Sequence, residues 1–220
     1  MCGRFVRKGE AGKVGKFLGV LHGGQDWTES FNVAPGTRIP IVVPGQAGRR
    51  LIPATWGFTA PMPGRPLFNA RGETVHRLPT FRESFRSRRC LVPAGGFYEW
   101  RRTDRQPHYF ERHDSLPMAF AGIWIPGPCG HPHAAIITTV SNREMHGIHH
   151  RMPVVLEQAR WAEWLGPDAL PDRNRLSLLA PPPDGTLNRW PVGREVGDVR
   201  NDHPGLLNRI REVFVPELFD

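Results

Sequence analysis

Proline and glycine constrain the fold of this chain more than any other feature of its sequence. The 220 residues include 23 prolines and 24 glycines, scattered along the chain without an internal repeat or a long low-complexity tract. Both residue types interrupt regular backbone structure, so their spacing leaves room mainly for short elements. This punctuation is typical of sheet-rich folds, and the sequence therefore predicts an architecture made mostly of strands.

Eight short segments have the composition of strands and are bounded by turn residues. They are 38–43, 51–58, 90–92, 96–101, 108–112, 118–124, 134–140 and 152–156. Eight strands suggest a closed or nearly closed sheet. We therefore expect a single α+β domain over residues 1–220, built on a mostly antiparallel, barrel-like β-sheet with a few peripheral helices.

Helices are predicted at fewer places. Apolar residues recur at the helical spacing i, i+3, i+4 and i+7 in one early segment: Val14, Phe17, Leu18 and Leu21. Thr80 and Glu83 have the spacing of a capping box that opens a helix over 81–88. Helical spacing also occurs over 157–165 and 206–214, whereas the proline-rich stretch 167–185 is expected to be a surface loop.

The charge of the chain favours a polyanionic partner. Lys and Arg together number 29 against 21 acidic residues, which gives a formal charge of +8, and most of the positive charge is arginine. The planar guanidinium fork suits phosphate, so nucleic acid is the leading candidate. The alternative is that an arginine-rich and proline-rich composition reflects a GC-rich genome.

The apolar pattern and the cysteines predict the cellular compartment of the protein. The sequence has no run of 18 apolar residues and no hydrophobic signal core after its first residues, so we expect neither membrane insertion nor secretion. Its three cysteines, Cys2, Cys90 and Cys129, form no even disulfide framework. The prediction is a cytoplasmic, nucleoid-associated monomer with free thiols and no membrane partner.

Cys2 is the residue with the most distinctive chemistry. Methionine aminopeptidase removes Met1 when the next side chain is small, which would leave Cys2 as the mature amino terminus. Its α-amine, with a reference pKa near 7.7 to 8.0, and its thiol then lie on adjacent carbons. Such a pair traps aldehydes, because the amine forms a Schiff base and the thiol closes on the same carbon to give a stable thiazolidine.

Seven motifs carry a resemblance to a known family, and they follow that family's order. They are Cys2-Gly3-Arg4-Phe5, Phe31-Asn32-Val33-Ala34-Pro35-Gly36, Trp56-Gly57-Phe58, Asn69-Ala70-Arg71-Gly72-Glu73-Thr74, Gly95-Gly96-Phe97-Tyr98-Glu99-Trp100, His149-His150-Arg151-Met152-Pro153 and Val199-Arg200-Asn201. Across nearly the whole chain the sequence closely resembles the SRAP family, the SOS-response-associated peptidases.

The resemblance implies a sensor of abasic sites in single-stranded DNA that attaches covalently through Cys2 and shields the lesion. It also implies removal of the residue ahead of the cysteine, with a lyase-type activity left open. An abasic deoxyribose equilibrates with a ring-opened aldehyde, which is the electrophile that an amine and a neighbouring thiol trap. The base is already missing, so no base has to be extruded.

Glu99, His149 and Asn69 are the other predicted catalytic residues. Glu99 shares a strand face with Phe97, and an apolar setting would favour its protonated form, whereas pairing with Arg101 is the alternative. By family resemblance it shuttles protons. His149, aligned with the family's Ile-His-x-Arg motif, is expected to titrate near neutrality and to protonate the sugar oxygen. Asn69 would hold the amino-terminal residue or the opened sugar, or else form an Asx-turn.

Five residues are predicted to contact DNA. Each of three arginines lies within two residues of a proposed catalytic group, where the phosphates flanking the lesion must pass: Arg4, Arg71 and Arg151. Trp56 joins them from its motif. Bacterial relatives often carry a tryptophan pair in the loop at 60–66, which this chain lacks, and Met62 with its flanking prolines is predicted to act there as an apolar wedge.

Two other functions compete with this interpretation. One is an N-terminal-nucleophile hydrolase or cysteine peptidase that uses Cys2, His149 and Asn69, although peptide cleavage needs no basic surface. The other is a noncovalent binder of single strands or modified bases. No cofactor is expected. A zinc site is disfavoured, because the available ligands match no closed structural spacing: His146, His149, His150, Cys129, His131 and His133.

Overall fold

The computed structural model describes residues 2–22, 27–58, 66–166 and 172–211. The strands are β1 (Arg4–Arg7), β2 (Val20–His22), β3 (Ser30–Val33), β4 (Arg38–Gly45), β5 (Gly48–Trp56), β6 (Asn69–Arg71), β7 (Arg89–Ala94), β8 (Gly96–Trp100), β9 (Pro107–Arg112), β10 (Met118–Ile125), β11 (His133–Val140), β12 (Arg151–Pro153) and β13 (Leu187–Pro191). The α-helices are α1 (Ala11–Leu18), α2 (Pro79–Ser87), α3 (Trp161–Leu165) and α4 (Asp172–Ser177). Short 3-10 turns are η2 (Pro128–Gly130), η3 (Arg143–Met145), η4 (Gln158–Arg160), η5 (Arg194–Gly197) and η6 (Pro204–Leu207).

The strands form two sheets. The smaller sheet has the order β13-β9-β8-β1-β3, and all its pairings are antiparallel. The larger has the order β12-β11-β10-β7-β4-β5-β2, with β6 added beside β11. Because β5 also pairs with β11, the strands β11, β10, β7, β4 and β5 close into a ring. This closure confirms the predicted barrel-like sheet, which is antiparallel except for the pairings β2–β5, β5–β11 and β6–β11.

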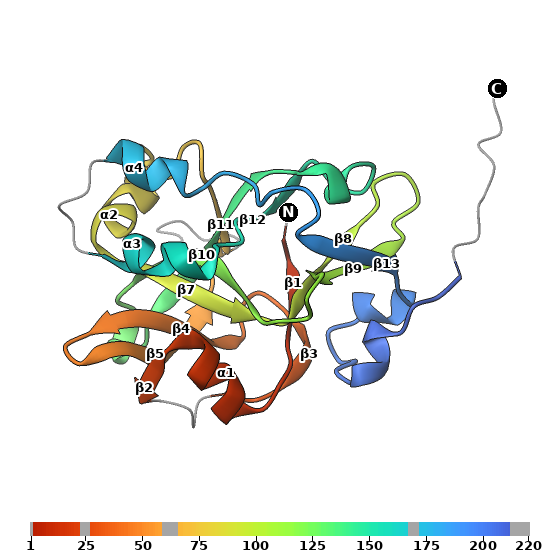
Figure 1. Ribbon diagram of the computed structural model, residues 1–220, viewed down its shortest axis with the longest axis horizontal. Coiled ribbons are helices and arrows are strands. Elements are labelled where there is room, and N and C mark those ends of the chain that lie inside the picture. The colour runs from red at the N-terminus through yellow and green to blue at the C-terminus, as the bar shows by residue number, and fades with distance from the viewer. Residues whose placement is uncertain (1, 23–26, 59–65, 167–171, 212–220) are drawn as a thin grey trace.

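Strand β1 lies between the two halves of the molecule. In Figure 1, β8, β9 and β13 lie on one side of β1, and α2, α3 and α4 gather on the other, beyond the barrel. A buried apolar cluster joins the two sheets, because it contains Phe97 and Phe110 from the smaller sheet with Trp56 and Phe120 from the barrel. Cys2 belongs to this cluster. The first residues of the chain are thus held in the interface between the sheets.

All eight predicted strands are confirmed, and five others were not predicted. The additional strands are β1, β2, β3, β6 and β13. Each has three to five residues, too few for an alternating pattern to stand out, and β6 exists because Asn69, Ala70 and Arg71 pair with the long strand β11. Gly96 permits close packing within the smaller sheet, since a Cβ there would lie 2.2 Å from the Tyr109 hydroxyl.

The first three helix predictions were right in place but wrong at their ends. Helix α1 stops at Leu18 because Gly19 takes the left-handed conformation (φ 63°), so Leu21 lies in β2. The predicted capping box is wrong: α2 begins at Pro79, and its N-cap residue Leu78 makes no side-chain capping bond.

The later helical segments also differ from the prediction. Over 157–165, a 3-10 turn precedes the short helix α3. The predicted loop over 167–185 contains α4 within its described part. The helix predicted over 206–214 is wrong for the described residues, where η6 ends at Leu207 and Arg209 forms a β-bridge with Val192. No helix in the described part of the chain is long and apolar enough to cross a membrane.

Candidate active site

Cys2 lies fully buried immediately before β1. Burial raises the pKa of its thiol well above the ordinary value, and the nearby Glu99 carboxylate raises it further, because both disfavour a second negative charge. The thiol is therefore protonated at neutral pH. Because the thiolate is the nucleophilic form of cysteine, this thiol has to lose its proton as it forms a bond.

Asn69 holds the Cys2 backbone from the neighbouring sheet. Its Nδ2 donates a hydrogen bond of 2.8 Å to the Cys2 carbonyl oxygen, across 67 positions of sequence. The pairing of Asn69 with Ile136 in β11 fixes the backbone that presents this amide. The Oδ1 atom of Asn69 is buried and has no hydrogen-bond partner among the described residues. It is an acceptor in reach of a donor that enters the site, such as an amine or a hydroxyl.

Glu99 lies beside Cys2 on strand β8. Strand β8 pairs with β1, with Tyr98 opposite Arg4, and Glu99 is 3% exposed. Burial raises the pKa of the Glu99 carboxyl to about 7, while the positive charge of the amino terminus acts in the opposite direction. The expected preference for the protonated form is confirmed in direction. Arg101, the alternative partner, makes hydrogen bonds of 2.9 and 2.6 Å to Asp104 instead.

His149 lies half-buried just before β12, and its Nδ1 is 3.0 Å from the backbone N–H of Arg151, which donates to it. The same Nδ1 lies 3.1 Å from the Arg151 carbonyl oxygen, to which it donates in the other tautomer, so Arg151 holds the ring in place in either form. Burial, with a smaller contribution from the amino-terminal charge, lowers the pKa of His149 to about 4. This corrects the expectation that it titrates near neutrality. At pH 7 His149 is neutral, and His146 and His150 are exposed as expected.

The three predicted phosphate-binding arginines have different settings. Arg71 is exposed, and its side chain forms no hydrogen bond or ion pair with a described residue. Arg4 donates 2.7 Å hydrogen bonds to the Asn32 side chain and to the Val196 carbonyl, which ties β1 to β3 and η5. Of the three, only Arg71 presents its whole charge to solvent.

Arg151 is buried and committed to protein partners. Its guanidinium forms a forked ion pair with Glu73 and donates to the Thr138 carbonyl at 2.7 Å. A phosphate contact by Arg151 stays a prediction, and it would require this side chain to leave Glu73. Glu73 belongs to a motif noted in the sequence, but its role as the partner of Arg151 was missed, because the two residues are 78 positions apart.

Trp56 was wrongly predicted to contact DNA. Its side chain is 0% exposed, its Nε1 donates to the Phe68 carbonyl at 2.9 Å, and its ring packs edge-on against Phe5. No surface of the indole is exposed for contact with DNA. The side chain instead packs against Phe5 of β1 and bonds Phe68, the residue that precedes β6. Met62, the predicted wedge, lies outside the described residues.

One further cation near the site was missed by the sequence reasoning. Arg102 is exposed and close enough to His149 for its charge to help lower the pKa of that ring. It follows the Glu99 motif directly, and the basic pair Arg101-Arg102 was the signal that could have identified it. Within the described part of the chain, no group of three or more His, Cys, Asp or Glu side chains is arranged to hold a metal ion.

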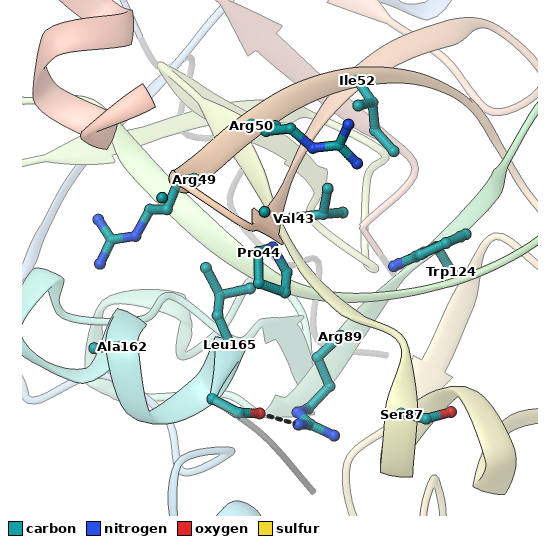
Figure 2. A pocket seen from close by; sticks show the side chains of 13 residues that line it. Val43, Pro44, Arg49, Arg50, Ile52, Ser87, Arg89, Trp124, Ala162 and Leu165 are labelled. Carbon is teal, nitrogen blue, oxygen red and sulfur yellow. Dashed lines mark hydrogen bonds between the residues drawn. The ribbon is translucent and has the colours of Figure 1, made fainter. Parts of the chain in front are cut away.

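A separate cavity of about 630 Å³ opens between the β4–β5 hairpin and α3, and Figure 2 shows the arginines around it. We call it the arginine-lined cavity, after Arg49, Arg50 and Arg89. Arg89 donates to the Trp164 and Phe85 carbonyls at 2.7 and 2.9 Å, and Arg49 donates to the Leu18 carbonyl at 3.0 Å. These bonds satisfy the carboxyl ends of α3, α2 and α1. None of the predicted site residues lines this cavity.

Comparison of the chain with known proteins shows which family it belongs to. The family model described as "SOS response associated peptidase (SRAP)" matches residues 1–199. The chain belongs to the SRAP family. It is 33% identical to "Abasic site processing protein YoqW" of Bacillus subtilis, over 94% of this chain and 99% of that protein. It is 28% identical to "Abasic site processing protein YedK" of Escherichia coli, over 82% and 84% of the two chains.

A solved structure shows the same fold. A protein from Bacteroides thetaiotaomicron superimposes with a TM-score of 0.80 at 25% identity, covering 96% of this chain and all of that chain. The fold expected from the resemblance is therefore confirmed.

Proposed function

We propose that this chain processes abasic sites in single-stranded DNA by linking Cys2 covalently to the opened sugar. One observation carries the proposal: Asn69 holds the Cys2 backbone while the Glu99 carboxyl lies close enough to shift the pKa of the Cys2 thiol. The relatives YoqW and YedK are named as abasic site processing proteins, which supports the same substrate. The net charge of +8 suits a polyanion.

The first step joins the Cys2 amine to the sugar. Removal of Met1 frees this amine, and we propose that Glu99 assists the removal. Glu99, with a pKa of about 7, is poised to accept a proton from the amine as it attacks the C1′ aldehyde. His149, neutral at pH 7, is suited to accept the proton of the anomeric hydroxyl as the ring opens and to return it, as the imidazolium, to the sugar ring oxygen. Loss of water leaves a Schiff base.

The second step closes the thiazolidine ring. The Cys2 sulfur adds to the imine carbon, so that a C–S bond forms, the C=N double bond becomes a single bond, and the thiol proton passes to the nitrogen. The thiol has to give up its proton as the C–S bond forms, and the imine nitrogen on the same carbon is the group that receives it. The Asn69 Oδ1 can accept a hydrogen bond from the amine or a sugar hydroxyl throughout.

The protonation states argue against the peptidase alternative as the main function. A cysteine peptidase depends on a thiolate beside an imidazolium. Here the pKa of the Cys2 thiol is raised and that of His149 is lowered to about 4, so both groups favour their neutral forms. Peptide-bond cleavage is therefore proposed only for the removal of Met1, and strand cleavage by elimination at the Schiff base stage is proposed as a side activity.

A denaturing gel tests the proposal. The wild-type chain is incubated with a single-stranded oligonucleotide containing one abasic site, boiled and separated, and we expect a shifted band. Cys2→Ala retains an amine and should give a band only after borohydride reduction, and a form with one extra residue ahead of Cys2 should give none. Cys90→Ala, which removes the other buried thiol, is the matched control and should react normally. Binding without any boiled-stable band in the wild type would favour the noncovalent alternative.

A further inference from the structure

His108 lies next to Glu99 on the neighbouring strand and has no role in the steps above. In the antiparallel pairing of β8 with β9, Glu99 is directly opposite His108. Each of these two polar residues is 3% exposed. Directly opposite residues of an antiparallel pair project to the same face with their Cβ atoms about 4.5–5.5 Å apart. The carboxyl and the imidazole are thus neighbours in the interior.

The pair of opposite residues two positions earlier on these strands, which projects to the same face, is in direct side-chain contact. Phe97 lies opposite Phe110, and their rings stack with centroids 5.0 Å apart and planes 10° from parallel. Both rings belong to the buried cluster that contains Cys2. Since side chains alternate along a strand, Glu99 and His108 project to this same side, toward the amino terminus.

A neighbouring carbonyl fixes the tautomer of His108. Its Nδ1 lies 3.2 Å from the Gln106 carbonyl oxygen, which can only accept, so Nδ1 carries the hydrogen. Gln106 is itself held by hydrogen bonds from its Nε2 to the carbonyls of Pro107 and Val192, at 3.0 and 2.8 Å. In the neutral ring the lone pair is therefore on Nε2, the nitrogen that can take a proton.

We propose that His108 is a positioning residue that orients the Glu99 carboxyl and exchanges its proton. This inference rests on the proposed function. When Glu99 has accepted a proton from the Cys2 amine, the O–H bond breaks and an N–H bond forms at His108 Nε2, which leaves carboxylate beside imidazolium. The proton returns by the reverse transfer when Glu99 must act as an acid. The pair thus stores one proton near the reacting carbon, and the transfer between its two members leaves their summed charge unchanged.

The other charged and titratable groups around the pair are few. Strand β1 brings Cys2 and the amino-terminal charge, and His149 feels the same charge from the segment before β12. On their own hairpin, Arg101 is paired with Asp104. Strand β13 places Pro191, which is uncharged, opposite His108. His108 is thus the titratable side chain directly in register with Glu99.

The pH dependence of crosslinking tests the proposal. Crosslinking rates are measured from pH 5 to 9 with the abasic oligonucleotide for wild type, His108→Phe, His108→Gln and the exposed control His146→Ala. We expect the wild-type rate to rise with an inflection near 7, where Glu99 ionises. His108→Phe keeps the ring volume but cannot become a cation, so the inflection should move about one unit higher and the rate at pH 7 should fall about fivefold.

The glutamine variant separates positioning from proton exchange. His108→Gln can still hydrogen-bond the carboxyl, so its maximal rate at high pH should recover toward wild type while its inflection stays high. His146→Ala should match the wild type. A purely structural role for His108 would scale the rate in both variants without moving either inflection, and that result would overturn the proposal; if the phenylalanine variant does not fold, the glutamine variant decides in the same way. Absence of any crosslink in the wild type would instead refute the proposed function.

Discussion

The surroundings of Cys2 and the arginine-lined cavity both hold polar groups inside the protein, but the two regions use them differently. In the cavity, Arg89 and Arg49 donate hydrogen bonds to carbonyl groups at helix ends. Around Cys2, the Asn69 Oδ1 is buried without a described partner, and the pKa values of Cys2, Glu99 and His149 are all shifted toward the neutral form.

The difference separates polar groups that stabilise the fold from polar groups that are available for chemistry. A buried donor whose bonds are complete contributes to stability and has nothing left for a ligand. A buried carboxyl near its pKa can accept or release a proton at neutral pH, at the cost of some stability. The arginine-lined cavity, at about 630 Å³, contains none of the residues proposed for catalysis.

Arg89→Ala should give the largest effect on stability. The substitution leaves carbonyl groups at the ends of α2 and α3 without donors, and each such loss costs about 1–3 kcal/mol, so we expect the free energy of unfolding to fall by about 3 kcal/mol. Urea denaturation measures this change. The exposed Arg50→Ala is the control, expected within about 0.5 kcal/mol of wild type. If Arg89→Ala left the free energy of unfolding nearly unchanged, the hydrogen bonds of the arginine-lined cavity would not be the stabilising kind.

Glu99→Gln and His149→Ala should give the largest effects on rate. Both groups are proposed to move protons, and such groups contribute about a hundredfold or more. We expect single-turnover crosslinking at pH 7 to slow by that factor while circular dichroism stays unchanged. His146→Ala should react at the wild-type rate. Should His150→Ala prove to be the slow variant, the proton carrier is His150 instead.

The pH dependence of stability should show the cost of burying the ionised Glu99 carboxylate. Its pKa is about 7 in the folded chain against an ordinary value of 4.5, so its stabilising contribution is present below pH 4.5 and is lost as the pH rises through 7. Glu99→Gln removes this loss. Thermal unfolding should therefore show a higher Tm for the variant than for wild type at pH 8 and little difference at pH 4. An equal difference at both pH values would mean that Glu99 is not held protonated.

Arg71→Ala should give the smallest of these effects, and it tests which arginines meet DNA. For single strands, the slope of log affinity against log salt changes by about 0.7 for each phosphate contact. We expect Arg71→Ala to flatten the slope by that amount and Arg50→Ala, an exposed arginine of the other region, to leave it unchanged. Arg4→Ala is predicted to act like Arg71→Ala. Equal salt slopes for Arg71→Ala and wild type would show that Arg71 contacts no phosphate of the DNA.

Local sequence patterns determined much of the fold. The eight predicted strand segments were recognisable because composition and bounding turns act over neighbouring residues. The short strands β1 and β6 were not, since each is held in place by a partner far along the chain, such as β8 for β1 and β11 for β6. The capping box failed for a local reason, because Pro79 already occupies the first helical position.

By itself, the sequence determined the chemical groups: a cysteine next to the removable Met1, and Asn69, Glu99 and His149 in recognisable motifs. Only the tertiary structure decided which of them meet and in which protonation state. Burial between two sheets moved the pKa values of Glu99 and His149 and removed Trp56 from the surface. Strand register placed His108 opposite Glu99. Desolvation and register depend on contacts between distant segments, and no local pattern encodes them.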